Sequence, residues 1–113
     1  MKVEHNIFNN VLFLFIDGDL LGETNGLEII DLISNYINKG ILRVVFDLSN
    51  VRYMNSSGIG VLITAYTKLK NKKGELLLVN PNDQINKLFL ITKLNTIFKI
   101  FPNKQEALEY FKG

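Results

Sequence analysis

The segment Asp47-Leu-Ser-Asn-Val-Arg-Tyr-Met-Asn-Ser-Ser-Gly-Ile-Gly-Val-Leu62 carries the strongest structural signal in this chain of 113 residues. The apolar run Ile41 to Phe46 precedes it, and apolar residues at helical spacing follow its glycines. This order predicts a strand, a polar loop and a helix that begins near Ser57. A serine hydroxyl is therefore expected at the first turn of a helix.

The serine pair has two local interpretations. The first N–H groups of a helix lack partners within the helix and carry about half a positive charge, so a phosphate on Ser56 would be stabilised there. Alternatively, Asn55, Ser56 or Ser57 is simply the N-cap, because asparagine and serine are among the preferred residues at that position. The local chemistry alone favours the cap.

The whole segment resembles the signature of the STAS domain family, in particular its stand-alone anti-sigma factor antagonists, whose motif is usually Asp-Ser-Ser/Thr-Gly-Leu/Ile-Gly. The resemblance implies that Ser56 is phosphorylated by a partner kinase. It also implies a partner-binding surface made of Asn55, Ser56, Ser57, Gly58 and Ile59. Asn55 stands where the family usually has aspartate, which removes a negative charge beside the phosphate acceptor.

The resemblance implies a protein-binding module and no enzyme. Without phosphate it would bind an anti-sigma factor serine kinase, which has a histidine-kinase-like ATPase fold, and phosphorylation of Ser56 would release it. The alternative is a constitutive STAS subunit of a larger assembly, such as a lipid-transport ABC system, where the same helix start docks on the ATPase without phosphorylation. Asn55 favours this alternative. A nucleotide or small-ligand binder is a third possibility, for which the sequence identifies no pocket.

The rest of the chain predicts an α/β fold with the element order ββαβαβαβα. A tight Asn9-Asn10 turn joins the first two strands into an antiparallel hairpin. The predicted strands are 2–8, 11–16, 41–46, 75–79 and 96–101, and the helices begin near Asn25, Ser57, Asp83 and Asn103. Alternation with short loops predicts parallel pairing after the hairpin, hence a mixed sheet with helices packed against it. We expect one STAS-like domain over residues 1–113.

Two local features leave alternatives open. The Asp47 carboxylate either accepts hydrogen bonds from the backbone of the turn into Ser49 and Asn50 or places a charge near Ser56. The first interpretation is favoured. Gly58 and Gly60 each cost about 1 kcal/mol in a helix relative to alanine. Either the helix packs closely on the sheet there, or a partner's backbone must approach the serine, and the two explanations are compatible.

The composition limits the classes of function. With 47% apolar and 21% charged residues the chain can form a core, and its net charge of +2 gives no strong surface for nucleic acid or an anionic membrane. It has no cysteine and one histidine, His5, so we expect no metal site and no cofactor. The apolar run Val11 to Ile16 is too short to span a bilayer, and no export signal is evident, so a cytoplasmic location is expected.

Overall fold

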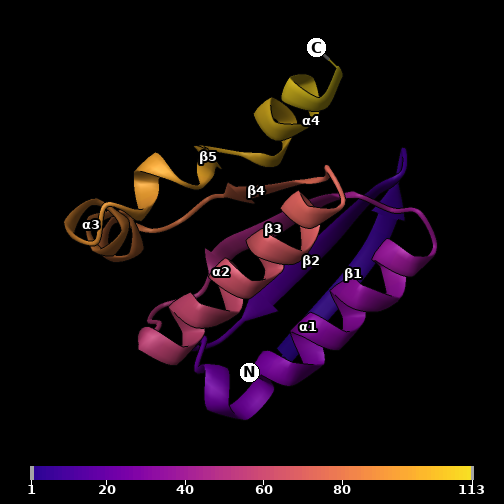
Figure 1. Cartoon of the computed structure of the whole chain (residues 1–113). Helices are drawn as coiled ribbons and strands as arrows, with labels where there is room; N and C mark the ends of the chain where they lie inside the picture. The colour runs from indigo at the N-terminus through magenta and orange to yellow at the C-terminus, as the bar shows by residue number, and fades with distance from the viewer. Residues whose placement is uncertain (1, 113) are drawn as a thin grey trace.

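The protein folds into one five-stranded mixed sheet with helices on both faces (Figure 1). The computed structural model describes residues 2–112, and residues 23–25 only by their backbone. In chain order the elements are β1 (Lys2–Phe8), β2 (Val11–Asp17), α1 (Gly22–Asn38), β3 (Arg43–Asn50), α2 (Ser56–Asn71), β4 (Glu75–Val79), α3 (Asp83–Ile91), the short 3-10 helix η1 (Leu94–Thr96), β5 (Lys99–Phe101) and α4 (Lys104–Lys112). The predicted order of strands and α-helices is confirmed.

The strands lie side by side in the order β1-β2-β3-β4-β5. β1 pairs antiparallel with β2, and the turn residues Asn9 and Asn10 have φ values of 53° and 62°, which asparagine tolerates better than most residues. All later pairs are parallel. The predicted mixed sheet with an N-terminal hairpin is therefore confirmed.

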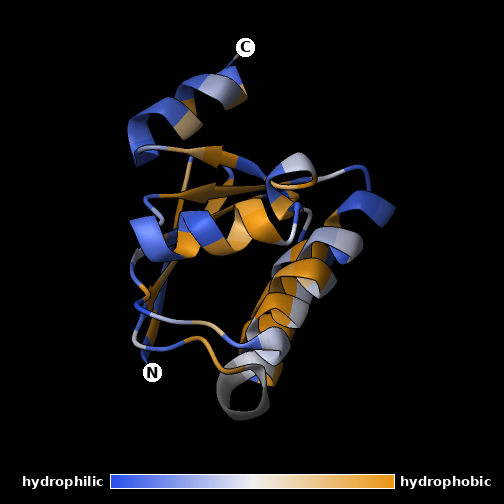
Figure 2. Ribbon diagram, turned by 90° about the vertical axis from the view of Figure 1, so that its left-hand side faces the viewer, coloured by the Kyte–Doolittle hydropathy of each residue, from blue (hydrophilic) through white to orange (hydrophobic). Residues whose placement is uncertain are grey.

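Side chains alternate along each strand, and this alternation gives the sheet two buried faces. Leu14 of β2, Phe46 of β3 and Leu78 of β4 belong to a large cluster beneath α1, α2 and α3. Phe13 and Val45 point the other way, into a smaller cluster that α4 covers. Figure 2 shows hydrophobic residues along the strands and on α1 and α2, whereas α4 is largely hydrophilic. The second face is thus covered by one short helix.

Helix α1 begins at Gly22, three residues before the start predicted at Asn25. Leu21 occupies the N-cap position without a side-chain hydrogen bond, and the side chain of Asn25 lies outside the described residues. α2 comes close to α1 at this first residue, because a Cβ atom at Gly22 would lie 2.3 Å from the backbone oxygen of Ser57, so only glycine fits there. Such a contact between two helices cannot be seen in a local sequence pattern.

Two predicted strand ends also differ from the structure by three or more residues. β3 continues past Asp47 to Asn50, because Asp47 pairs with Phe15 and Asn50 with Asp17 of the neighbouring strand. The last strand begins at Lys99 and not at Thr96. The backbone N–H groups of Ile97 and Phe98 donate to the carbonyl of Leu94 at 3.0 and 2.9 Å, so residues 94–98 form a helical turn instead.

Candidate docking site at the start of helix α2

Asn55 is the N-cap of α2, and this leaves both serine side chains out of the cap. The Asn55 side-chain oxygen Oδ1 accepts a hydrogen bond from the N–H of Gly58 at 2.8 Å. Ser56 is the first helical residue, and both Ser56 and Ser57 are exposed. No hydrogen bond of either serine side chain is found within the described residues. The structure therefore assigns the capping role to Asn55 and presents the Ser56 hydroxyl to solvent.

The electrostatic surroundings of Ser56 suit an anion. Ser56 lies at the positive end of the α2 dipole, and the first turn of α2 contains no acidic residue. The Asp19 carboxylate lies in the neighbouring loop and is paired with Arg52, whose Nε is 3.9 Å from Oδ1. Arg52 is highly exposed, so this pair contributes little to stability.

The loop that carries Asn55 is held in place by the segment that follows β2. The Gly18 N–H donates to the Asn50 carbonyl at 3.0 Å, and the Leu20 N–H donates to the Tyr53 carbonyl at 2.9 Å. Leu20 also forms an isolated parallel bridge with Met54. Because these bonds fix residues 50–54, the start of α2 has a defined position relative to the sheet.

The two glycines of α2 have different surroundings. A Cβ atom at Gly58 would lie 2.1 Å from the backbone oxygen of Leu20, so close packing explains this glycine. At Gly60 the same added atom would meet nothing within 4 Å. Close packing therefore explains Gly58, although α2 meets the Leu20 segment after β2 there and not the sheet as predicted. Close packing does not explain Gly60.

An open apolar groove runs between α1 and α2 from Ser57 onwards. Its lining includes Gly26 and Leu27 of α1 and Gly60 and Val61 of α2. Leu27 is the first of four apolar residues that follow one another at helical spacing in α1, before Ile30, Ile33 and Ile37, yet its side chain is 75% exposed. Tyr53, just before the cap, is 50% exposed. These two exposed apolar side chains were missed because apolar residues cover more than one face of α1, and because Tyr53 lies in a loop without a periodic pattern.

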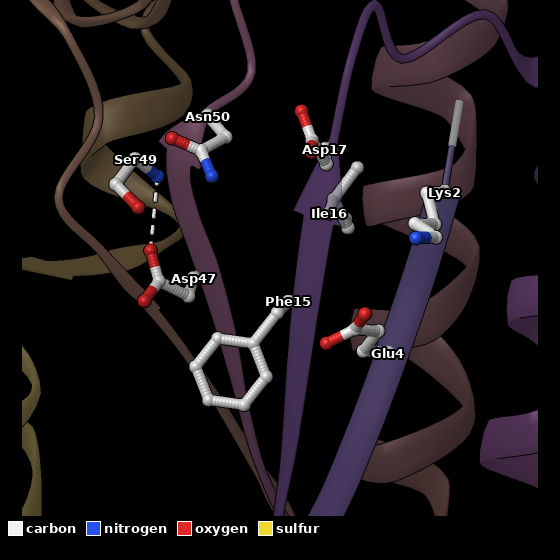
Figure 3. A pocket seen from close by; sticks show the side chains of 8 residues that line it. All are labelled: Lys2, Glu4, Phe15, Ile16, Asp17, Asp47, Ser49 and Asn50. Carbon is white, nitrogen blue, oxygen red and sulfur yellow. Dashed lines mark hydrogen bonds between the residues drawn. The ribbon is translucent and has the colours of Figure 1, made fainter.

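Asp47 lies on the other side of the sheet from α2. Its Oδ1 accepts a hydrogen bond from the Ser49 N–H at 2.9 Å, so the predicted local backbone bond is confirmed (Figure 3). Asp47 shares a small hollow with Phe15, Glu4 and Asp17, and α2 does not contribute to it. The alternative, a charge beside Ser56, is therefore wrong.

Within residues 2–112, no group of three or more His, Asp or Glu side chains has an arrangement that could hold a metal ion, and this includes the acidic hollow of Figure 3. No helix in that range is both long enough and apolar enough to cross a membrane.

The family model of the STAS domain matches residues 2–107. This chain belongs to the STAS domain family. Among curated relatives, the anti-sigma F factor antagonist of Paenibacillus polymyxa is 26% identical over 113 residues, which cover 96% of this chain and 92% of the relative. The anti-sigma-B factor antagonist of Listeria monocytogenes is 40% identical over 60 residues, covering 53% of this chain and 51% of the relative.

Solved structures confirm the fold. The crystal structure of the Thermotoga maritima protein TM1081 matches with a TM-score of 0.90 at 25% identity, covering 98% of this chain and 95% of that one. The anti-sigma factor antagonist SpoIIAA in its unphosphorylated form gives a TM-score of 0.77 at 19% identity, with 99% of both chains covered. At that identity the second match shows a shared STAS fold alone.

Proposed function

We propose that this chain is an anti-sigma factor antagonist that binds an anti-sigma factor serine kinase and is released when Ser56 is phosphorylated. The observation that carries the proposal is the exposed Ser56 hydroxyl at the first position of α2, with the capping bond supplied by Asn55. The names of the Paenibacillus and Listeria relatives support the same role. The protein acts by binding and not by catalysis, in the cytoplasm, as one domain over residues 1–113.

The docking surface consists of residues 55–59 and the adjoining groove between α1 and α2. Exposed Leu27 and Tyr53 supply apolar area, which drives association when it is removed from water. Gly60 leaves room for a partner's backbone or side chain. Because Gly58 fixes the start of α2 against Leu20, the surface is formed before the partner arrives, and little ordering is needed on binding.

Phosphorylation of Ser56 acts on the complex and not on the fold. A phosphate adds about −1.5 to −2 charges at neutral pH. In water the dipole of α2 and the absence of acidic residues in its first turn favour this charge. In the complex the same charge must be buried against a partner. This burial costs free energy unless the partner places a cation opposite the phosphate. The partner is therefore released while the domain stays folded.

A second candidate function keeps the docking surface and omits the phosphate. In this case the chain is a constitutive STAS subunit that docks on the ATPase of a larger assembly, such as a lipid-transport ABC system. The observation that favours it is Asn55 itself, which caps α2 through a neutral amide where the family usually has a carboxylate.

Mass spectrometry after incubation with ATP and the serine kinases of the same cell separates the two functions. We expect one added phosphate on the unaltered chain, none on Ser56→Ala, and one on Ser57→Ala. The second variant is a close control, because Ser57 is also exposed and lies in the same helical turn. A stable complex with a transporter ATPase and no added phosphate on any variant would favour the second function.

A binding assay tests how the phosphate acts. We expect Ser56→Glu to weaken binding to the kinase at least tenfold. Asn71→Asp is the control, because it also adds one negative charge to α2, about 22 Å further along the helix. It should leave the affinity unchanged. Equal binding by Ser56→Glu and the unaltered chain would show that the start of α2 is not in the interface.

A further inference from the structure

A hollow of about 270 Å³ lies between α4 and the tip of the β1–β2 hairpin, lined in part by the beginning of β3. Val11 forms part of its lining and is only 2% exposed. Leu108 and Phe111 of α4 line it with half-buried side chains, and Phe8 of the hairpin is 53% exposed. The lining thus combines apolar residues from the hairpin and from α4 with polar residues from three distant parts of the chain.

The charged residues that line the hollow are Arg43, Lys112 and Glu109, which give a net charge of +1. Arg43 lies over the Phe111 ring, with its Cζ 5.3 Å from the ring centroid. Its Nη1 donates to the Phe111 carbonyl at 3.5 Å, which is a long hydrogen bond. Within the described residues, the other N–H groups of Arg43 donate no hydrogen bond. The guanidinium therefore lies against an aromatic ring beside the hollow and still has donors for a ligand.

We propose that this hollow binds a small amphipathic carboxylate, with its apolar part against Val11, Leu108 and Phe111 and its carboxylate on Arg43. The planar guanidinium matches a carboxylate with two parallel hydrogen bonds, and the single excess positive charge matches a monoanion. The volume of 270 Å³ lies just below the range of about 300–1,000 Å³ that is typical of pockets for drug-sized ligands. The ligand is therefore a short acyl chain or a single-ring acid.

This site is separate from the docking surface. α4 packs on the face of the sheet opposite to α1 and α2, and none of the residues that line the hollow belongs to the groove beside Ser57. The proposal therefore does not depend on the proposed function. It gives the chain a small-molecule site in addition to a protein-binding one.

The test is a titration of the isotope-labelled chain with octanoate, followed by backbone amide NMR shifts. We expect saturable shifts at Val11, Leu108 and Phe111. 1-Octanol should bind about tenfold more weakly, because it lacks the charged acceptor, and octylamine should not bind. Saturable shifts confined to the α1–α2 face, or none up to about 10 mM octanoate, would overturn the proposal.

Variants identify the residue that recognises the charge. Arg43→Met keeps an apolar stem near Phe111 and should weaken octanoate binding about tenfold while leaving octanol binding unchanged. Arg52→Met is the control, because this arginine is also exposed and lies in the loop before α2. Leu108→Trp should fill the hollow and remove binding of both ligands. Equal affinity for octanoate and octanol, or equal loss in the two arginine variants, would refute a carboxylate site. Shifts that depend on protein concentration without ligand would show a second copy there instead.

Discussion

Replacing Gly58 of α2 with alanine should destabilise the protein, whereas replacing Gly60 with alanine should stabilise it. At Gly58 the new Cβ would lie 2.1 Å from the Leu20 backbone oxygen, and an ordinary contact needs at least 3.4 Å, so one backbone must retreat by about 1.3 Å. Leu20 cannot do so freely, because it is fully buried and its N–H is bonded to Tyr53. At Gly60 the Cβ would meet nothing within 4 Å.

These distances indicate how much each substitution should change the free energy of unfolding. Overpacking of a core usually costs about 1–3 kcal/mol, and a clash with the backbone of a buried residue belongs at the upper end. Alanine in place of glycine returns about 1 kcal/mol of helix propensity at either position. We therefore expect Gly58→Ala to lose about 2 kcal/mol of unfolding free energy and Gly60→Ala to gain about 1 kcal/mol.

Thermal unfolding followed by circular dichroism measures the difference. At about 4 °C per kcal/mol for a domain of this size, the midpoints of the two variants should differ by about 12 °C. Each variant is a control for the other, since both make the same substitution two residues apart in one helix. Equal shifts, or a Gly58→Ala variant as stable as the unaltered chain, would refute the account of how α2 is positioned. If Gly60→Ala is more stable than the unaltered chain but binds the kinase more weakly, the partner occupies the space at Gly60 in the complex.

Three further substitutions test the cap, the end of the sheet and the groove. Asn55→Ala should lower the unfolding free energy by about 1 kcal/mol in urea, because it removes the bond to the Gly58 N–H. The Lys99 ammonium donates hydrogen bonds to the Tyr110 hydroxyl and to the Glu75 carboxylate, and these bonds raise the pKa of Lys99 despite some opposing desolvation. The stability that Lys99 contributes is therefore fully present below about pH 10.4 and is lost as the pH rises through its folded pKa. Lys99→Met should therefore reduce stability near neutral pH but lose this difference in strongly alkaline buffer, measured by urea unfolding at each pH. Leu27→Lys should change stability by less than about 0.5 kcal/mol yet weaken kinase binding, whereas Ile91→Lys, at a comparably exposed site on α3, should leave binding unchanged in the same assay.

The order of elements could be predicted because each one leaves a local signal. Alternation and the Asn9-Asn10 turn indicate the hairpin, and the step from strand to polar loop to helical spacing indicates the start of α2. Element ends were predicted less well where they depend on a neighbour. β3 extends to Asn50 where β2 pairs with it, and α1 begins at Gly22 where it meets the first turn of α2.

The surroundings of the candidate site depend on such contacts even more strongly. Leu27 and buried Ile33 lie about 120° apart around α1, and because apolar residues cover more than one narrow face of this helix, the sequence did not show which of the two is buried. The hollow beneath α4 joins Phe8, Arg43 and Phe111, which lie far apart in the sequence and carry no common motif. Only the packing of α4 on the second face brings them together.

Because Asn55 caps α2, a group added to the Ser56 hydroxyl leaves the capping bond in place. If the Ser56 hydroxyl held the Gly58 N–H, adding a phosphate would remove a bond that stabilises α2, and phosphorylation would be coupled to unfolding of the first turn. In this chain the bond belongs to Asn55, and Ser56 adds no side-chain bond to the described structure. A charge can therefore be added at Ser56, where the helix dipole favours it, with no loss of folding energy. The added charge then changes the affinity for a partner without changing the stability of the domain, as a reversible binding switch requires.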